Sequence, residues 1–212
     1  MKIDFVSDVS CPWCAIGLQS LQRAIDNLDG AVDTELHVQP FELNPNMAPE
    51  GQDIGEHLAE KYGSTPEQRE RNSEAIRQRG EALGFEFRTG ARSRVYNTFD
   101  AHRLLHWAQI EGRQLELKQA LFSAYFTLGE NPGSHEVLLR VAGEVGLDAG
   151  KAREVLESGL FADEVRERER FYQSAGINSV PAVIINDKHL ISGGQPPEVF
   201  ERALRQIAEE AV

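Results

Sequence analysis

The stretch FVSDVSCPWCAIGLQSL, residues 5–21, holds the only two cysteines of the chain, Cys11 and Cys14. The segment KIDFVS at residues 2–7 alternates polar and apolar side chains, which predicts a short strand leading into the cysteine loop. From Cys14 to Leu28 the apolar residues recur at helical spacing. We therefore predict a strand, a short loop and then a helix that begins at the cysteines.

This placement has a chemical consequence for the two sulfurs. The start of a helix presents unpaired backbone N–H groups and the positive end of the helix dipole, and both favour the thiolate form of Cys11. Two intervening residues bring the sulfurs to one helix end, close enough for a disulfide, and Pro12 presets the backbone there at little cost. Cys14 is expected to be the more buried sulfur. Asp8 would oppose thiolate formation if its carboxylate faced Cys11.

The composition limits the classes of function. A chain of 212 residues with 41% apolar and 26% charged residues is expected to fold around a core. Its net charge of -12 would repel a polyphosphate, so no nucleic-acid partner is expected. There is no basic leader before an apolar segment and no apolar run long enough for a membrane span, which predicts a cytoplasmic protein without membrane association. The oligomeric state is not defined by these features.

In a reducing compartment, a C-x-x-C pair indicates either redox chemistry or metal binding. A closed zinc site needs four ligands, and the only candidates for a second pair are His102 and His106, far from the cysteines in sequence. We therefore predict a redox pair and no metal.

Patterns in the rest of the sequence predict the other strands and helices. Residues 32–43 alternate like a second strand, and residues 181–192 predict two more strands around a turn, followed by an amphipathic helix. Between Gln52 and Gly176 no convincing strand is found. Helical patterns occupy that region at residues 51–62, 65–83, 97–112, 113–128, 134–146, 148–159 and 162–176.

The order is thus βαβ, a helical block, then ββα. These two units can share one sheet, with the helical block leaving and rejoining it. We predict an α/β fold with a large helical insertion domain. The predicted limits are 1–48 and 177–212 for the two parts of the sheet domain and 49–176 for the insertion.

Several motifs together resemble the FrnE-like branch of the DsbA family, over nearly the whole chain. The motifs are CPWC at 11–14, PFELNP at 40–45, NTFDAHRLLHWA at 97–108, SVPAVII at 179–185 and ISGGQP at 191–196. The resemblance implies a thioredoxin-like fold and a thiol-disulfide oxidoreductase acting on proteins or low-molecular-weight thiols and disulfides. It implies that Cys11 is the attacking thiol and Cys14 the resolving thiol.

The resemblance also implies the substrate-binding residues. Pro181 matches the family proline that opens the strand facing the cysteines after a cis peptide bond, here with Val180. Pro12 and Trp13, between the cysteines, are expected to contact substrate. His102 is expected near the mouth of the cleft, although a histidine that is half-buried for structural reasons is the simpler interpretation.

Two alternatives remain open from the sequence. The same fold with a helical insertion also resembles kappa-class glutathione transferases and 2-hydroxychromene-2-carboxylate isomerases. Those proteins carry serine where this chain has Cys11. A chaperone-like peptide-binding module would use an apolar groove beside Pro181 and need neither cysteine. No cofactor is expected beyond the redox-active disulfide, with glutathione as the one candidate co-substrate.

Overall fold

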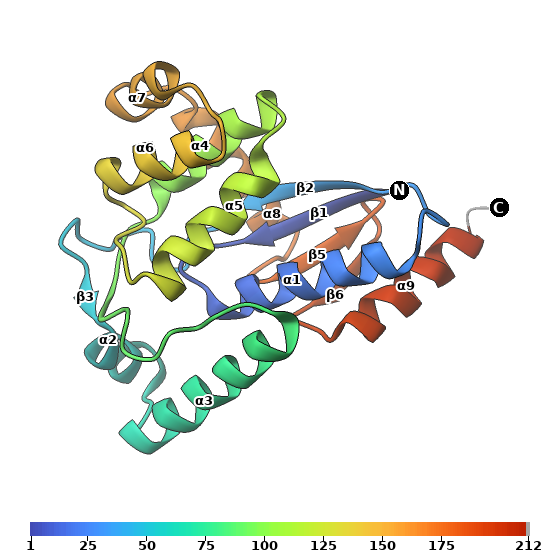
Figure 1. Ribbon diagram of the computed structural model, residues 1–212, viewed down its shortest axis with the longest axis horizontal. Coiled ribbons are helices and arrows are strands. Elements are labelled where there is room, and N and C mark those ends of the chain that lie inside the picture. Colours follow the sequence, from blue (N-terminus) through green and yellow to red (C-terminus); the bar gives the residue numbers. More distant parts are fainter. Residues whose placement is uncertain (211–212) are drawn as a thin grey trace.

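The computed structural model describes residues 1–210. Its centre is a four-stranded sheet with strand order β2-β1-β5-β6 (Figure 1). β1 and β2 run parallel, and β5 is antiparallel to both β1 and β6. The βαβ and ββα units therefore share one sheet, as predicted. The strands are β1 (Lys2–Ser7), β2 (Glu35–Pro40), β5 (Ala182–Ile185) and β6 (His189–Ser192).

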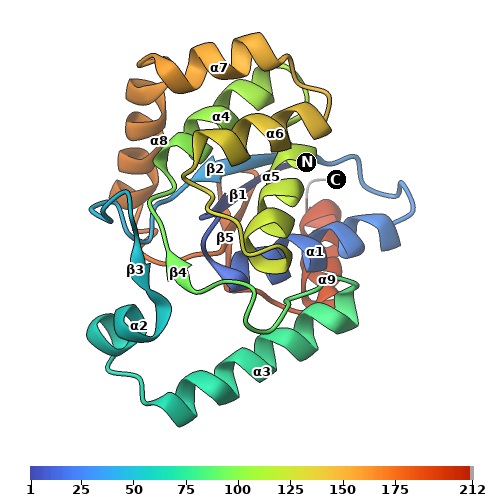
Figure 2. The same cartoon turned by 60° about the vertical axis from the view of Figure 1, so that its left-hand side comes forward.

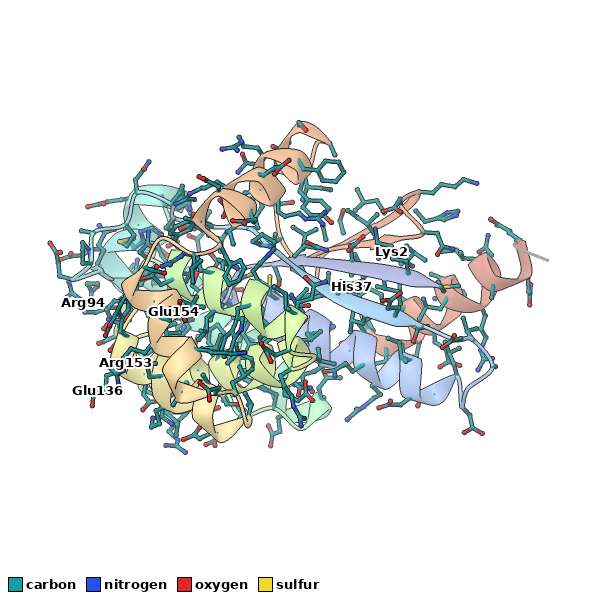
Figure 3. The ribbon with its side chains drawn as sticks, turned by 90° about the horizontal axis from the view of Figure 1, so that it is seen from above. Lys2, His37, Arg94, Glu136, Arg153 and Glu154 are labelled. Atoms are coloured by element: carbon teal, nitrogen blue, oxygen red, sulfur yellow. The ribbon has the colours of Figure 1, made fainter. Side chains whose placement is uncertain are left out.

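Helices cover both faces of this sheet because the strand residues alternate between two apolar clusters. Phe5 and Val183 pack in the cluster that includes apolar residues of α1 (Pro12–Asn27) and α9 (Pro197–Glu210). The next residues along these strands face the other side, where Tyr172 of α8 (Ala162–Ser174) packs. Figure 3, which views the molecule from above, shows α1 and α8 on opposite sides of the strands.

The predicted helical block is present between β2 and β5 (Figure 2). Thr65 forms a capping box at the start of its helix, and Asp148 accepts a hydrogen bond from the Lys151 backbone N–H. Ser134 occupies the N-cap position of its helix without a side-chain cap bond. Before α8, this block contains α2 (Ile54–Tyr62), α3 (Pro66–Leu83), α4 (Phe99–Ile110), α5 (Gln114–Phe122), a π-helical turn (Ser123–Thr127), α6 (His135–Glu144) and α7 (Ala149–Glu157).

The prediction of no strand in this block was wrong. β3 (Gln52–Asp53) and β4 (Arg94–Val95) pair antiparallel in a small ribbon of their own. Strands of two residues are too short to show an alternating pattern, so the sequence carried no signal for them. Figure 2 shows the ribbon beside α2, on the side of the molecule where α1 begins at the cysteines.

The helical block contributes to the same core as the sheet. Phe122 of α5 and Phe126 of the π-helical turn belong to one buried cluster with Phe5 of β1 and Leu18 of α1. A second cluster lies among α4, α5, α6 and α7. In Figure 3 the labelled residues Arg94, Glu136 and Arg153 lie at one end of the molecule, away from Lys2 and His37 at the strands. The predicted domain limits remain a prediction.

Within residues 1–210, no helix combines the length and the apolar character that crossing a membrane requires.

Candidate redox site

Cys11 lies at the N-cap of α1, with Pro12 in the first turn. The Cys11 carbonyl accepts from the backbone N–H groups of Cys14 at 3.1 Å and Ala15 at 3.3 Å, which places the Cys11 side chain at the open end of the helix. Both thiols are free, and Cys11 is 5% exposed against 0% for Cys14. The predicted order of exposure is therefore confirmed, although both sulfurs count as buried.

Val180 faces the Cys11 sulfur from the other side of the site. The Cys11 thiol donates to the Val180 carbonyl oxygen, with 3.8 Å between sulfur and oxygen. The Val180–Pro181 peptide bond is cis, as the resemblance predicted. β5 begins directly after Pro181, so the sheet fixes this loop opposite the start of α1.

Two glycines allow that close approach. A Cβ atom on Gly17 of α1 would lie 3.1 Å from Pro181 Cγ, and a Cβ on Gly194 would lie 2.8 Å from the Trp13 carbonyl oxygen. Gly194 of the ISGGQP motif therefore packs directly on the CPWC turn.

Cys14 points into the core and shares its surroundings with a charged group, Lys118 of α5. Burial raises the pKa of the Cys14 thiol well above its usual value, and the neighbouring Cys11 sulfur acts in the same direction. The charge of Lys118 acts in the opposite direction. Burial lowers the pKa of Lys118 to about 8. The resolving position thus has a buried cation beside it.

Asp8 anchors the loop before the cysteines. Its carboxylate accepts from the Leu43 backbone N–H at 2.7 Å, the Thr98 hydroxyl at 2.8 Å and the Ser10 hydroxyl at 3.0 Å. Burial alone would raise the pKa of Asp8, but His102 and these donors outweigh it and lower the pKa to about 2. The carboxylate therefore ties together the segments after β1 and β2 and the start of α4.

The structure corrects the expected position of His102. The side chain is buried, with the residue 2% exposed, and its Nε2 atom lies 3.5 Å from Asp8 Oδ1. His102 does not line the cavity beside Cys11. Because it lies behind Asp8, the prediction that it sits at the cleft mouth was wrong.

A cavity of about 720 Å³ opens beside Cys11. Pro12, Trp13 and Val180 line it together with Cys11, so four of the predicted site residues meet there. The opposite wall comes from α2, α3 and the β3–β4 ribbon. This volume lies within the range of small-molecule pockets.

Three cations line that opposite wall: Lys61 of α2, Arg69 of α3 and Arg92. Lys61 donates to the Leu43 carbonyl and to Asn44, and Arg69 donates to the Ser64 carbonyl. Arg92 lies over the ring of Tyr125, 5.3 Å from its centroid. Among the described residues, none of the three cations makes a salt bridge.

The negative charge in the lining of the same cavity is balanced by an arginine. Glu42, the one acidic residue of its lining, pairs with Arg166, which also contacts Glu169 at 2.8 Å. Burial raises the pKa of Glu42, and the nearby Glu169 adds to the effect. A chain of net charge -12 therefore presents unpaired positive charge beside Cys11.

Residues 1–210 contain no group of three or more His, Cys, Asp or Glu side chains arranged to hold a metal ion. His106, the other histidine considered for such a site, lies against the Phe161 ring at 5.1 Å.

Fold and site together define a thioredoxin-like thiol-disulfide oxidoreductase with a C-x-x-C pair at the start of its first helix. A family model described as the DSBA-like thioredoxin domain matches residues 2–205. The chain belongs to this family.

Two relatives are similar to this chain over nearly its whole length. The crystal structure of a "probable DsbA oxidoreductase" from Streptomyces coelicolor is 34% identical, covers 99% of this chain and 91% of that one, and superposes with a TM-score of 0.91. The uncharacterized protein YwbO of Bacillus subtilis is 29% identical over 205 residues, 96% of each chain.

More distant structures share the fold. Cytosolic disulfide reductase DsbM from Pseudomonas aeruginosa, solved with GSH, is 16% identical with a TM-score of 0.70 over 99% of this chain and all of DsbM. A 2-hydroxychromene-2-carboxylate isomerase is 13% identical with a TM-score of 0.72 over 100% of this chain and 98% of that one. At these identities the likeness shows the fold alone.

Sequence reasoning missed the residues that the helical block brings to the site. Arg92 lies about eighty residues and Lys118 about a hundred residues from the cysteines, and nothing local distinguishes them from solvent-exposed cations. The one available signal at Lys118 was its place in QLELKQALF, next to the apolar residue Leu117.

Proposed function

We propose that the chain reduces or exchanges disulfides through its Cys11–Cys14 pair, and that its substrates include low-molecular-weight disulfides carrying carboxylates. The observation that supports this most is the position of Cys11, at the start of α1 and on the wall of a cavity lined by unpaired cations. The pair itself is the redox group, and the proposal needs no further cofactor.

The reaction has two steps. The Cys11 thiolate attacks one sulfur of a substrate disulfide, forming a mixed disulfide and releasing one substrate thiolate, which takes up a proton. The Cys14 thiolate then attacks the Cys11 sulfur, so that the Cys11–Cys14 bond forms while the bond to substrate breaks. The substrate disulfide gains two electrons and the cysteine pair loses them. A reducing thiol such as glutathione would return the pair to the dithiol.

The groups around Cys11 have suitable roles in this reaction. The Val180 carbonyl lies where an extended substrate backbone could pair with it, as an added strand does. Trp13 and Pro12 offer apolar surface, while Lys61, Arg69 and Arg92 supply positive charge for carboxylates. A glutathione-like molecule has both an extended backbone and carboxylates.

We also propose that the protein works in the cytosol. The observation that supports this is the fold shared with DsbM of Pseudomonas aeruginosa, which is described as a cytosolic disulfide reductase and was solved with GSH. Under the reducing poise of that compartment such pairs are mostly dithiols, which favours reduction over net oxidation.

The first test is Cys14→Ser, because this variant separates attack from release. Serine cannot resolve the mixed disulfide, so the variant is expected to accumulate adducts at Cys11 that dithiothreitol removes. Cys11→Ser is the matched control and is expected to accumulate none. Mass spectrometry of adducts formed with glutathione disulfide, and with a disulfide-bonded peptide, would show which class of partner is captured.

Two other results would replace the proposal. Full turnover by Cys14→Ser without any adduct would favour the glutathione transferase or isomerase alternative, which needs no resolving thiol. Suppression of aggregation by the protein with both cysteines replaced, without disulfide exchange by the unmodified protein, would favour the chaperone-like peptide-binding module.

A further inference from the structure

Lys118 is a charged residue in a fully buried environment, and packing alone does not explain a charge there. It belongs to α5 in the helical block, its residue exposure is 0%, and it is among the largest fully buried side chains. Its ammonium group has no hydrogen-bond partner among the described residues. A buried, unpartnered ammonium is costly, so it marks a position where a charge has a use beyond packing.

The surroundings of Lys118 combine an aromatic ring with the redox pair. Its Nζ atom lies 5.0 Å from the centroid of the Phe122 ring, and this ring shares a core cluster with Cys14 and Cys11. Gln119, the next residue of α5, donates to Gln22 of α1 at 2.8 Å, which fixes α5 against the helix that carries the cysteines.

The ionisable groups whose charge acts on the pKa of Lys118 are Cys14, with the largest effect, and then Asp8 and Cys11. Asp8 is committed to its own donors, with His102 behind it. Cys11 is at the cavity wall and becomes bonded to substrate after the first step. In the mixed disulfide, Cys14 is therefore the group near Lys118 whose charge must change for the reaction to proceed.

We propose that Lys118 is a positioning residue of the redox pair, whose buried ammonium stabilises the Cys14 thiolate required for the resolving step. This inference rests on the proposed function. Cys14 S–H loses its proton to water, and the thiolate formed beside Lys118 attacks the Cys11 sulfur. The Cys11–Cys14 bond forms, the bond from Cys11 to substrate breaks, and the departing thiolate takes up a proton.

The helical block would then do more than cover the site. Burial, the largest cause, holds the pKa of Cys14 high, which would leave little thiolate available to release a trapped substrate. The cation from α5 offsets that effect at the sulfur that needs it, while Cys11 relies on the end of α1. The two steps of the exchange are thus supported by different elements.

The test uses 5,5′-dithiobis(2-nitrobenzoate) as the disulfide, because each of the two steps releases one coloured thiolate. Attack by Cys11 gives the first release and attack by Cys14 on the mixed disulfide gives the second. Lys118→Met keeps an unbranched side chain of similar length without the charge. We expect it to slow the second release about tenfold or more at neutral pH, since one pKa unit is a factor of ten. The first release should change by less than about twofold.

A pH profile separates a charge effect from a packing effect. In Lys118→Met, the midpoint of the second release should move to higher pH by about one unit or more, because Cys14 has lost its stabilising cation. Leu117→Ala, a buried neighbour on the same helix, is the control for packing: it should lower the melting temperature without moving that midpoint.

Lys118→Gln, which keeps a polar side chain at this position without the charge, is the second variant if Lys118→Met does not fold. The same slowing of the second release is expected from it. Equal slowing of both releases, or an unchanged second release in a folded variant, would overturn the role of Lys118. If the unmodified protein gave no second release, the proposed function itself would fail.

Discussion

At the scale of single residues, Asp8 is the group on which the geometry of the cysteine loop depends. Three donors from separate segments converge on its buried carboxylate. We expect Asp8→Asn to lower the free energy of unfolding by about 3 kcal/mol, because the amide turns a donor toward groups that also donate. Urea unfolding at neutral pH measures this change. Asp29→Asn, an exposed counterpart, should change stability by less than about 0.5 kcal/mol.

The same carboxylate predicts a pH dependence. The pKa of Asp8 is about 2 in the folded protein, against an ordinary value near 3.8, so its ionised form is stabilised by folding. The corresponding stability is fully present above about pH 4 and is lost as the pH falls toward 2, amounting to about 2.5 kcal/mol. Urea unfolding at pH 5 and pH 2.5 should show about two thirds of this loss, and the Asp8→Asn variant should lack the contribution of this carboxylate.

Arg69 provides a residue-scale test of the substrate class. It is half-buried on the cavity wall, whereas Arg71 on the same helix is exposed and does not line the cavity. Arg69→Gln is expected to raise KM for glutathione disulfide about tenfold, the effect of one lost charge-assisted hydrogen bond. KM for the uncharged bis(2-hydroxyethyl) disulfide should be unchanged. Arg71→Gln should leave both constants unaltered, and equal effects of the two substitutions would argue against an anion site at Arg69.

At the scale of elements, α1 and the loop before α9 are in close backbone contact at the site. A Cβ on Gly194 would lie 2.8 Å from a backbone oxygen, which cannot move without α1. Gly194→Ala is therefore expected to lower stability by about 2 kcal/mol in thermal unfolding. Gly143→Ala in α6 has open space around its Cβ and should instead stabilise by about 0.5–1 kcal/mol. If Gly194→Ala left the stability unchanged, the loop before α9 would have to move to make room for the added methyl group.

The elements also show how far the sequence allowed prediction. Helix periodicity, caps and alternating strands located the sheet and the helical block, because these are local signals within single segments. The ribbon of β3 and β4 was not predicted, because a strand of two residues is too short to show an alternating pattern. The helix that carries His102 was predicted correctly, but the direction in which the His102 side chain points was not. That direction depends on the packing against Asp8, which only the fold determines. Lys118 was invisible for the same reason: only the fold brings α5 to Cys14.

At the scale of the whole molecule, the shared core predicts cooperative unfolding. Phe122 comes from the helical block, yet it packs with residues of β1 and α1. Phe122→Ala should lower the stability of the entire chain by about 4 kcal/mol, and circular dichroism and fluorescence should still report one coincident transition. Leu128→Ala, at an exposed position, is the control. Two separate transitions would mean that the helical block folds independently of the sheet.

The positions of the two tryptophans give the molecule two separate optical reporters. Trp13 is half-buried between the sulfurs and faces the cavity, whereas Trp107 is buried in the other core cluster and donates to Glu111 at 3.1 Å. A disulfide next to an indole quenches its emission, and a thiol does so less. We therefore expect the fluorescence of Trp13 to follow the redox state of the pair and that of Trp107 to follow the integrity of the helical block.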